Sequence, residues 1–203
     1  MLNLDEIKTR LRNPEVQLDI LEKIDSTNDY LKSFTYQNRQ LHVCIAEMQT
    51  QGKGRLNREW HSPFGENIYF SMLYPFEKNI QSLSGLSLVV SLAVVRAIES
   101  TVELNGHPIH VKWPNDILID NHKLAGTLID IHAESNHICQ ATIGIGINVN
   151  MKQDENNIIN QPWTSLLQIT KKHQDRNSLC ASLINHLINY LERFSLKGLT
   201  AFI

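Results

Sequence analysis

The segment 107-HPIHVKWPNDILIDNHKLAGTLIDIH-132 decides the fold that we expect for this chain. Its apolar residues fall into short runs, which are separated by turn-forming residues at 114–116 and 120–122. This spacing predicts strands at residues 107–113, 117–119 and 124–132. Because a tight turn joins antiparallel neighbours, the segment predicts an antiparallel part of a sheet.

The rest of the chain extends this sheet and adds helices. Apolar patterning predicts further strands at residues 16–24, 42–48, 67–74 and 138–149. Helices are expected at residues 1–15, 28–34, 81–101, 164–170 and 178–194. The strands outnumber the possible helical crossovers, so we expect an α+β fold, with a mixed β-sheet backed by helices on one face. The length of 203 residues suits a single domain, 1–203.

The composition is that of an ordinary soluble globular protein, with 42% hydrophobic and 20% charged residues. A net charge of −2 argues against a general nucleic-acid binder. We expect no signal peptide, and no apolar run long enough to span a bilayer. The cysteines, Cys44, Cys139 and Cys180, form no Cys-x-x-Cys pair and no metal framework. These features predict a cytoplasmic protein without DNA or membrane partners.

The loop Gly52-Lys53-Gly54-Arg55-Leu56-Asn57-Arg58 carries three cations and two glycines in seven residues. Glycine lets backbone N–H groups approach a ligand closely, and consecutive N–H groups form a concave anion site. Arginine adds a planar fork that matches phosphate or carboxylate. The loop is neither a Walker A loop nor a dinucleotide fingerprint. It predicts a small anionic ligand, and a solvated basic turn is the alternative interpretation.

Further motifs occur in a fixed order around this loop. They are Asp25-Ser26-Thr27-Asn28, Ala46-Glu47-Met48-Gln49-Thr50, Lys112-Trp113-Pro114-Asn115-Asp116, Lys123-Leu124-Ala125-Gly126 and Gly144-Ile145-Gly146-Ile147-Asn148. With the loop, this ordered set resembles the biotin protein ligases, from about Leu18 to the end of the chain. The resemblance implies a ligand site on the open face of a mixed sheet. It also implies activation of biotin with ATP and Mg²⁺ to biotinyl-5'-adenylate, and transfer to a lysine of a biotin carboxyl carrier protein, an acetyl-CoA carboxylase subunit.

The resemblance assigns roles residue by residue. Catalytic roles fall on Arg55, Lys112 and Lys123. Biotin would be bound by Ser26, Thr27, Asn28, Gln49, Lys53, Gly54, Arg55, Lys123 and Gly126. ATP would be bound by Arg55, Arg58, Lys112, Asn115, Asp116, Asn148 and Trp163, with Asp116 as the candidate Mg²⁺ ligand. Each assignment has a plainer alternative, namely a helix cap at residues 26–28, a turn at residues 114–116 and solvated lysines at Lys112 and Lys123.

Glycine and tryptophan give two more expectations. Glycine weakens a strand unless something approaches the backbone closely, so Gly126, Gly144 and Gly146 suggest either a flat ligand on the sheet or bulges. We expect Trp60 and Trp113 to pack in the core.

Several points depart from the family pattern or stay open. Lys53 stands where arginine is usual in the family, and Asn57 stands where glycine is usual. Too few residues precede the first strand for a DNA-binding winged helix, and the small C-terminal β-barrel of the family is absent or truncated. A lipoate–protein ligase-like enzyme and a biotin-binding module without transfer activity are the alternative functions. A homodimer is left open.

Overall fold

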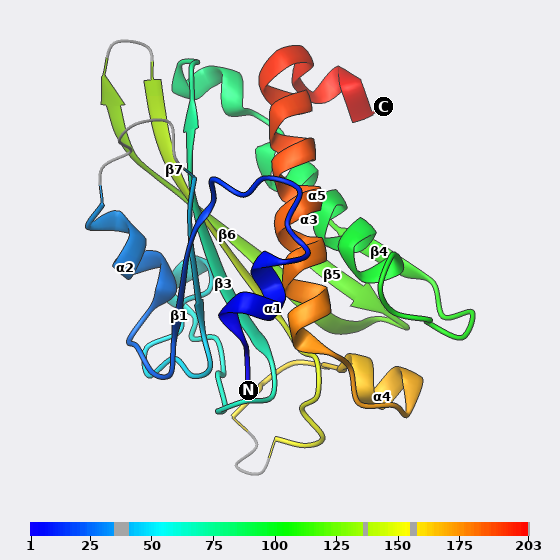
Figure 1. Cartoon of the computed structure of the whole chain (residues 1–203). Helices are drawn as coiled ribbons and strands as arrows, with labels where there is room; N and C mark the ends of the chain where they lie inside the picture. Colours follow the sequence, from blue (N-terminus) through cyan, green and yellow to red (C-terminus); the bar gives the residue numbers. More distant parts are fainter. Residues whose placement is uncertain (35–40, 136–137, 155–157, 203) are drawn as a thin grey trace.

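A computed structural model describes residues 1–34, 41–135, 138–154 and 158–202. The described residues form a seven-stranded sheet in the order β1-β2-β3-β7-β6-β5-β4 (Figure 1). The strands are β1 (Gln17–Leu21), β2 (His42–Ala46), β3 (Ile68–Phe76), β4 (Ile109–Lys112), β5 (Asp116–Ile119), β6 (His122–Ser135) and β7 (Ile138–Ile147). Strands β1 and β2 run parallel and every other neighbouring pair is antiparallel. The predicted mixed sheet is confirmed.

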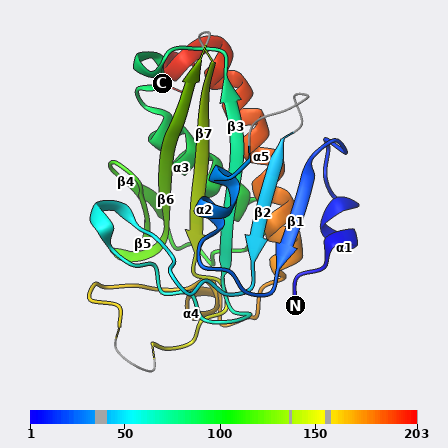
Figure 2. The same ribbon diagram turned by 90° about the vertical axis from the view of Figure 1, so that its left-hand side faces the viewer.

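The helices lie on both faces of the sheet. They are α1 (Leu4–Lys8), α2 (Thr27–Lys32), α3 (Leu86–Glu99), α4 (Leu166–Thr170) and α5 (Arg176–Lys197), with 3₁₀ turns η1 (Arg55–Asn57), η2 (Ile80–Leu83) and η3 (Gly198–Phe202). Helices α3 and α5 pack together against one face, whereas α2 lies on the other face, in front of the sheet in Figure 2. The expectation that all helices share one face was therefore wrong for α2.

Side-chain alternation along β7 separates the core from the open face. Cys139, Ala141, Ile143, Ile145 and Ile147 are buried in the main hydrophobic core. The intervening residues Thr142, Gly144 and Gly146 point to the other side, because successive side chains of a strand alternate. The β7 glycines therefore face α2 rather than α3 and α5, and they leave room above the sheet.

Helix boundaries differ from the sequence expectation at two places. The predicted helix at 81–101 is interrupted at Gly85, whose φ of +86° ends the η2 turn before α3 begins. The predicted helix at 1–15 spans only Leu4–Lys8, with Asn3 as its N-cap. Contrary to the sequence expectation, one segment, Ile80–Glu99, is long and apolar enough to span a membrane by length and composition. Half of that window is buried in the fold, as in the core helix of a soluble protein.

A buried ion pair ties α5 to the sheet. Arg176 Nη1 lies 2.6 Å from Glu47 Oε2, and the two side chains are 7% and 2% exposed. Arg176 also donates to the carbonyl of Asn67, whose own side-chain oxygen accepts from the N–H of Val149. The pair thereby supports the segment that leaves β7 beside Asn148.

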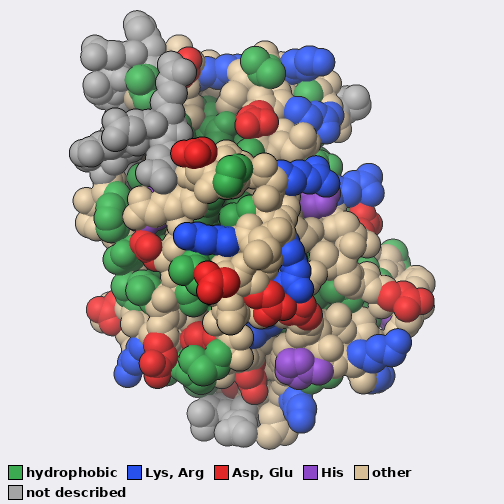
Figure 3. Space-filling model, in the orientation of Figure 1, with side chains coloured by type: hydrophobic (Ala, Val, Ile, Leu, Met, Phe, Trp, Pro, Cys, Tyr) green, Lys and Arg blue, Asp and Glu red, His purple; other side chains and the backbone are tan. Residues whose placement is uncertain are grey.

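Charge is spread over the outer surface. Acidic and basic side chains are interspersed over the face shown in Figure 3, in keeping with the net charge of −2. Cys44, Cys139 and Cys180 are buried and free.

Candidate functional site

Two adjoining cavities open on the α2 side of the sheet. The smaller, of about 210 Å³, lies between α2, the loop at residues 52–60 and the glycine face of β6 and β7. The larger, of about 800 Å³, lies between the same loop and residues 158–163. The residues that line both cavities are Gln49, Arg58, Glu59, Trp60, Lys123 and Gln161. A molecule in one cavity would therefore meet a molecule in the other at these side chains.

The first turn of α2 forms one wall of the small cavity. Ser26 is the N-cap of α2, where its hydroxyl accepts from the N–H of Asp29, and it also lines the cavity. The N–H and the hydroxyl of Thr27 both donate to Gln49 Oε1, at 2.9 and 3.1 Å. Capping thus explains Ser26, while Thr27 and Gln49 form a polar wall of hydroxyl and amide groups.

Asn28 lies directly on β7 at Gly144. A Cβ atom at Gly144 would stand 2.3 Å from Asn28 Oδ1, closer than real contacts allow. Asn28 Oδ1 accepts from the hydroxyl of Ser71 at 2.5 Å, and its Nδ2 donates to Asp130 at 3.1 Å. Glycine at position 144 is therefore required by the side chain of Asn28, before any ligand is considered.

Trp60 covers the other two strand glycines. A Cβ atom at Gly146 would stand 2.3 Å from the Trp60 indole, and one at Gly126 would stand 3.2 Å from it. The ammonium of Lys123 lies 5.3 Å from the centroid of the Trp60 ring. Trp60 therefore forms part of the cavity wall, and its expected place in the core was wrong. Trp113 is 80% exposed, so the same expectation was wrong for it.

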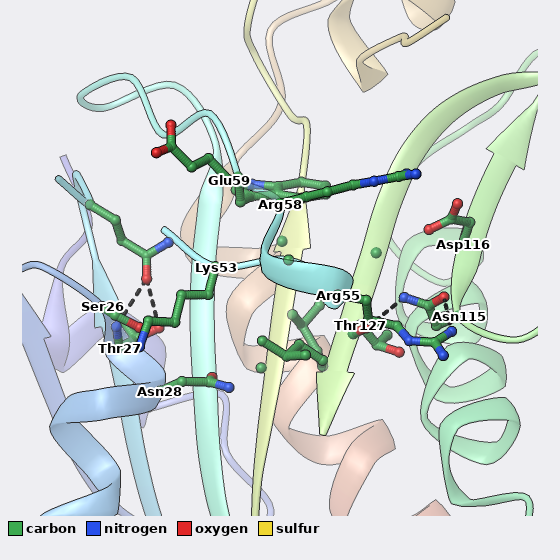
Figure 4. Close-up of a pocket in the computed structure, with 18 of the residues that line it drawn as sticks. Ser26, Thr27, Asn28, Lys53, Arg55, Arg58, Glu59, Asn115, Asp116 and Thr127 are labelled. Atoms are coloured by element: carbon green, nitrogen blue, oxygen red, sulfur yellow. Dashed lines mark hydrogen bonds between the residues drawn. The ribbon is translucent and has the colours of Figure 1, made fainter. Parts of the chain in front are cut away.

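The cations of the basic loop diverge toward opposite walls (Figure 4). Lys53 reaches α2, where its Nζ lies 2.5 Å from Asp29 Oδ2. Arg55 reaches the other side and donates to Asn115 Oδ1 at 3.1 Å. Directly after Arg55, the loop turns through left-handed backbone at Leu56 and Asn57, with φ of 57° and 59°. Asparagine tolerates this conformation, whereas a bulky leucine rarely adopts it.

Lys123 is the most strongly fixed cation of the site. Its Nζ lies 2.8 Å from Asp116 Oδ1. Its backbone N–H donates to Pro162, and its carbonyl accepts from the N–H of Thr164. The side chain of Asn148 also donates to the Lys123 carbonyl, at 3.4 Å. Lys123 is thus held at both its backbone and its head group, at the junction of the cavities.

The structure brings together nearly all the site residues predicted from the sequence. The small cavity is lined by Ser26, Thr27, Asn28, Gln49, Lys53, Gly54, Arg55, Arg58, Asn115, Asp116, Lys123 and Gly126, and the larger one by Asn148 and Trp163. Lys112 is exposed at the end of edge strand β4 and lines neither cavity. Its proposed catalytic role therefore has no support from this geometry.

The sequence reasoning missed several residues that line the cavities, among them Glu59, Trp60 and Gln161. It also missed Asp29, the ion-pair partner of the lining residue Lys53. Trp60 follows Arg58 by two residues, so its position next to the basic loop was the available signal. Asp29 follows Asn28 in the same helix turn, but its partner Lys53 could not be read from the order of residues.

Two carboxylates line the small cavity, those of Glu59 and Asp116. Among the described residues, no group of three or more His, Cys, Asp or Glu side chains could hold a metal ion. Mg²⁺ does not require such a group, because it is commonly bound by one or two carboxylates together with substrate phosphates and water. Asp116 beside Asn115 fits that kind of site.

Comparison with known proteins agrees with this geometry. The Biotin/lipoate A/B protein ligase family matches residues 20–148. The Bifunctional ligase/repressor BirA of Escherichia coli is 37% identical over 203 residues, which are 100% of this chain and 61% of that protein. The Biotin--[acetyl-CoA-carboxylase] ligase of Mycobacterium tuberculosis is 30% identical over 84% of this chain and 62% of its own length. The chain thus spans about three fifths of the length of these relatives.

Solved structures give the same result. The Aquifex aeolicus biotin protein ligase in complex with biotin and ATP superposes with a TM-score of 0.76 at 31% identity, over 92% of this chain and 75% of that one. The matched family residues include the α2 turn, the basic loop and the strands that carry Lys123 and the glycines. The chain therefore belongs to the Biotin/lipoate A/B protein ligase family.

Proposed function

We propose that this chain carries the catalytic site of a biotin protein ligase. It would activate biotin with ATP to biotinyl-5'-adenylate and then transfer the biotinyl group to a lysine of a biotin carboxyl carrier protein. The observation that carries the proposal is the position of Lys123, whose side chain lines both the small and the larger cavity. Biotin in the small cavity and ATP in the larger one would bring carboxylate and α-phosphate together at this ammonium.

The first step needs charge neutralisation rather than a protein nucleophile. The biotin carboxylate attacks the α-phosphorus of ATP, the new C–O–P linkage forms, and pyrophosphate leaves with the bond electrons. Because both reactants are anions, preorganised cations are the largest contribution a protein can make to such a step. Lys123, Arg55 and Arg58 line the small cavity and supply that charge.

The remaining residues would bind and orient. Thr27, Asn28 and Gln49 offer donors and acceptors suited to the ureido ring of biotin. Trp163 and Asn148 line the larger cavity, where they would contact the nucleotide. Asp116 would hold Mg²⁺ together with ATP oxygens, and the ion would neutralise phosphate charge.

In the second step the amine of the acceptor lysine attacks the mixed anhydride. An amide bond forms, the C–O bond to phosphate breaks, and AMP leaves. The acceptor would be a biotin carboxyl carrier protein, because the M. tuberculosis relative is named as a ligase of acetyl-CoA carboxylase. A cytoplasmic location is consistent with the three buried free cysteines, because thiols stay reduced there. A homodimer is the oligomeric state to test by measuring the mass of the protein in solution.

The decisive experiment is biotin-dependent exchange of pyrophosphate into ATP, with lipoate in place of biotin as a control. We expect exchange with biotin and none with lipoate. Transfer is then tested with a purified carrier domain, whose mass should rise by one biotinyl group. Exchange with lipoate alone would make the chain a lipoate ligase, and biotin binding without exchange would make it a binding module.

A further inference from the structure

The loop cation Lys53 has a protein partner. Its ammonium lies 2.5 Å from Asp29 Oδ2, and Lys53 itself lines the small cavity. Lys53 belongs to the basic loop and Asp29 to the first turn of α2, so the ion pair joins these two segments. Both side chains are partly exposed, at 46% and 42%.

Asp29 is itself anchored to the sheet. Lys32, one turn later in α2, contacts Asp29 Oδ1 at 3.5 Å and Asp130 Oδ2 at 2.9 Å. Asp130 is in β6 and also accepts a hydrogen bond from Asn28. The loop is therefore connected, through alternating charges, to the strand that forms the floor of the cavity.

The neighbouring lysines keep the Asp29 carboxylate ionised. Partial burial alone would raise the pKa of the Asp29 carboxyl, but the hydrogen bond and the charge of Lys53, followed by those of Lys32, hold the pKa below its ordinary value. Burial would likewise lower the pKa of Lys32, yet Asp130 and Asp29 raise it. Asp29 and Lys32 therefore both stay ionised at neutral pH.

We propose that Asp29 is a positioning residue, which fastens the basic loop over the small cavity through its ion pair with Lys53. The loop carries Arg55 and Arg58, so the pair sets how long these cations remain closed over a bound anion. The inference rests on the proposed function only for the identity of that anion, an acyl-adenylate. It also changes the role of Lys53, because the Lys53 ammonium forms an ion pair with Asp29 instead of binding the ligand.

The first test needs no ligand and no activity. An arginine-specific protease cuts after Arg55 and Arg58 whatever residue stands at position 53. We expect Asp29→Asn and Lys53→Gln each to speed cleavage of the unliganded chain about two- to fivefold, the effect of a partly exposed ion pair. The double variant should be no faster than either single one. Asp5→Asn, an exposed acidic residue of α1, is the matched control and should match the wild type.

The second test measures dissociation of preformed biotinyl-adenylate. Asp29→Asn and Lys53→Gln should speed dissociation by a similar factor, without additivity. The ion pair also contributes a little to stability, so each single variant should lower the unfolding midpoint by no more than about 2–4 °C, far less than the loss of the fold. Exchanging the charges, with Asp29→Lys and Lys53→Asp combined, should recover part of the slow dissociation. Added salt should speed dissociation more in the wild type than in Asp29→Asn, because salt screens exposed pairs.

The outcomes separate the two proposals. If the wild type forms no adenylate, the proposed function fails, and the protease test still decides the role of Asp29. If Lys53→Gln speeds dissociation far more than Asp29→Asn and the effects add, Lys53 binds the ligand directly and the positioning role is overturned. Equal cleavage rates in all variants would overturn it as well.

Discussion

Asp116 and Lys123 form an ion pair of 2.8 Å between neighbouring strands, at the place where the two cavities meet. The side chains are 26% and 16% exposed, so the pair is shielded but open to a ligand. The carboxylate fixes the direction of the ammonium without removing it from the cavity. A reacting anion would find its counter-charge already in place.

Replacing Lys123 is expected to stop adenylate formation. Lys123→Ala leaves a carboxylate and a phosphate facing each other without this cation, and loss of one preorganised donor costs on the order of 10²–10³ in rate. Lys123→Arg should also be strongly impaired, because the guanidinium differs in shape and reach. The measurement is biotin-dependent pyrophosphate exchange, with Lys8→Ala as an unaffected control. Wild-type exchange in Lys123→Ala would rule out the assigned role.

Arg55→Gly should weaken retention of the adenylate much more than it weakens the fold. Arg55 is exposed and donates to Asn115, so it contributes little to the core. A charge-assisted phosphate contact is worth about 1.5–3 kcal/mol, or roughly 10- to 150-fold in dissociation rate. Thermal unfolding should change little. A large fall in thermal stability with normal retention of adenylate would contradict the assignment.

The strand glycines should differ in their tolerance of a methyl group. Gly144→Ala and Gly146→Ala press on Asn28 and Trp60, and overpacking of this kind typically costs about 1–3 kcal/mol of unfolding free energy. Gly126→Ala should cost less, because a Cβ atom there would stand 3.2 Å from its nearest neighbours, Lys123 and the Trp60 ring, rather than 2.3 Å. Denaturant unfolding tests this ranking. Adding Asn28→Ala to Gly144→Ala should restore stability, and failure to do so would point to a different source of strain.

The buried pair of Glu47 and Arg176 is expected to be costly to break. Arg176→Met leaves a buried carboxylate without its partner, which typically destabilises a protein by about 3–5 kcal/mol. The double variant Arg176→Met with Glu47→Gln removes both charges and should be clearly more stable than the sum of the two single losses predicts. Strict additivity in denaturant unfolding would show that the two side chains are not coupled.

The Asp29 ion pair gives an expected pH dependence. The pKa of Asp29 is lowered by Lys53 and Lys32 against the effect of burial, so the folded chain binds this proton less readily than the unfolded chain does. The resulting stability is fully present above the ordinary aspartate pKa of about 3.9 and is lost as the pH falls through the lower, folded value. The stability difference between wild type and Asp29→Asn should be constant from about pH 5 to 8 and vanish in acid. A difference that grew in acid would contradict this.

Local sequence patterns were sufficient to predict most of the strands and helices. The errors have two different physical origins. The strands from β4 to β7 were predictable because turn residues stand between short apolar runs. The break at Gly85 was missed because apolar residues continue across it. The wrong placement of Trp60 has a different origin, because only the contact of the loop with Gly146 shows that the indole lies on the open face of the sheet.

The candidate site was predictable where each motif carries its own chemistry. The basic loop, Lys123 and the polar turn of α2 were all assigned correctly to one region, through resemblance and residue type. The pairing of Lys53 with Asp29 was not, because it depends on how two loops meet in space. Lys112 was assigned from its motif alone, and the alternation of β4 turns it outward.

The central pairing of β3 with β7 has a consequence for how the chain folds. The strands from β4 to β7 pair with near neighbours in sequence, whereas β3 must find a strand more than sixty residues away. Closing such a long loop costs more conformational entropy than forming a hairpin, so this pairing is expected to form more slowly. One wall of the small cavity comes from residues before β4, and its floor from residues after it. The binding pocket therefore does not exist until the two halves of the chain have docked, so ligand capture during refolding would time that late event directly.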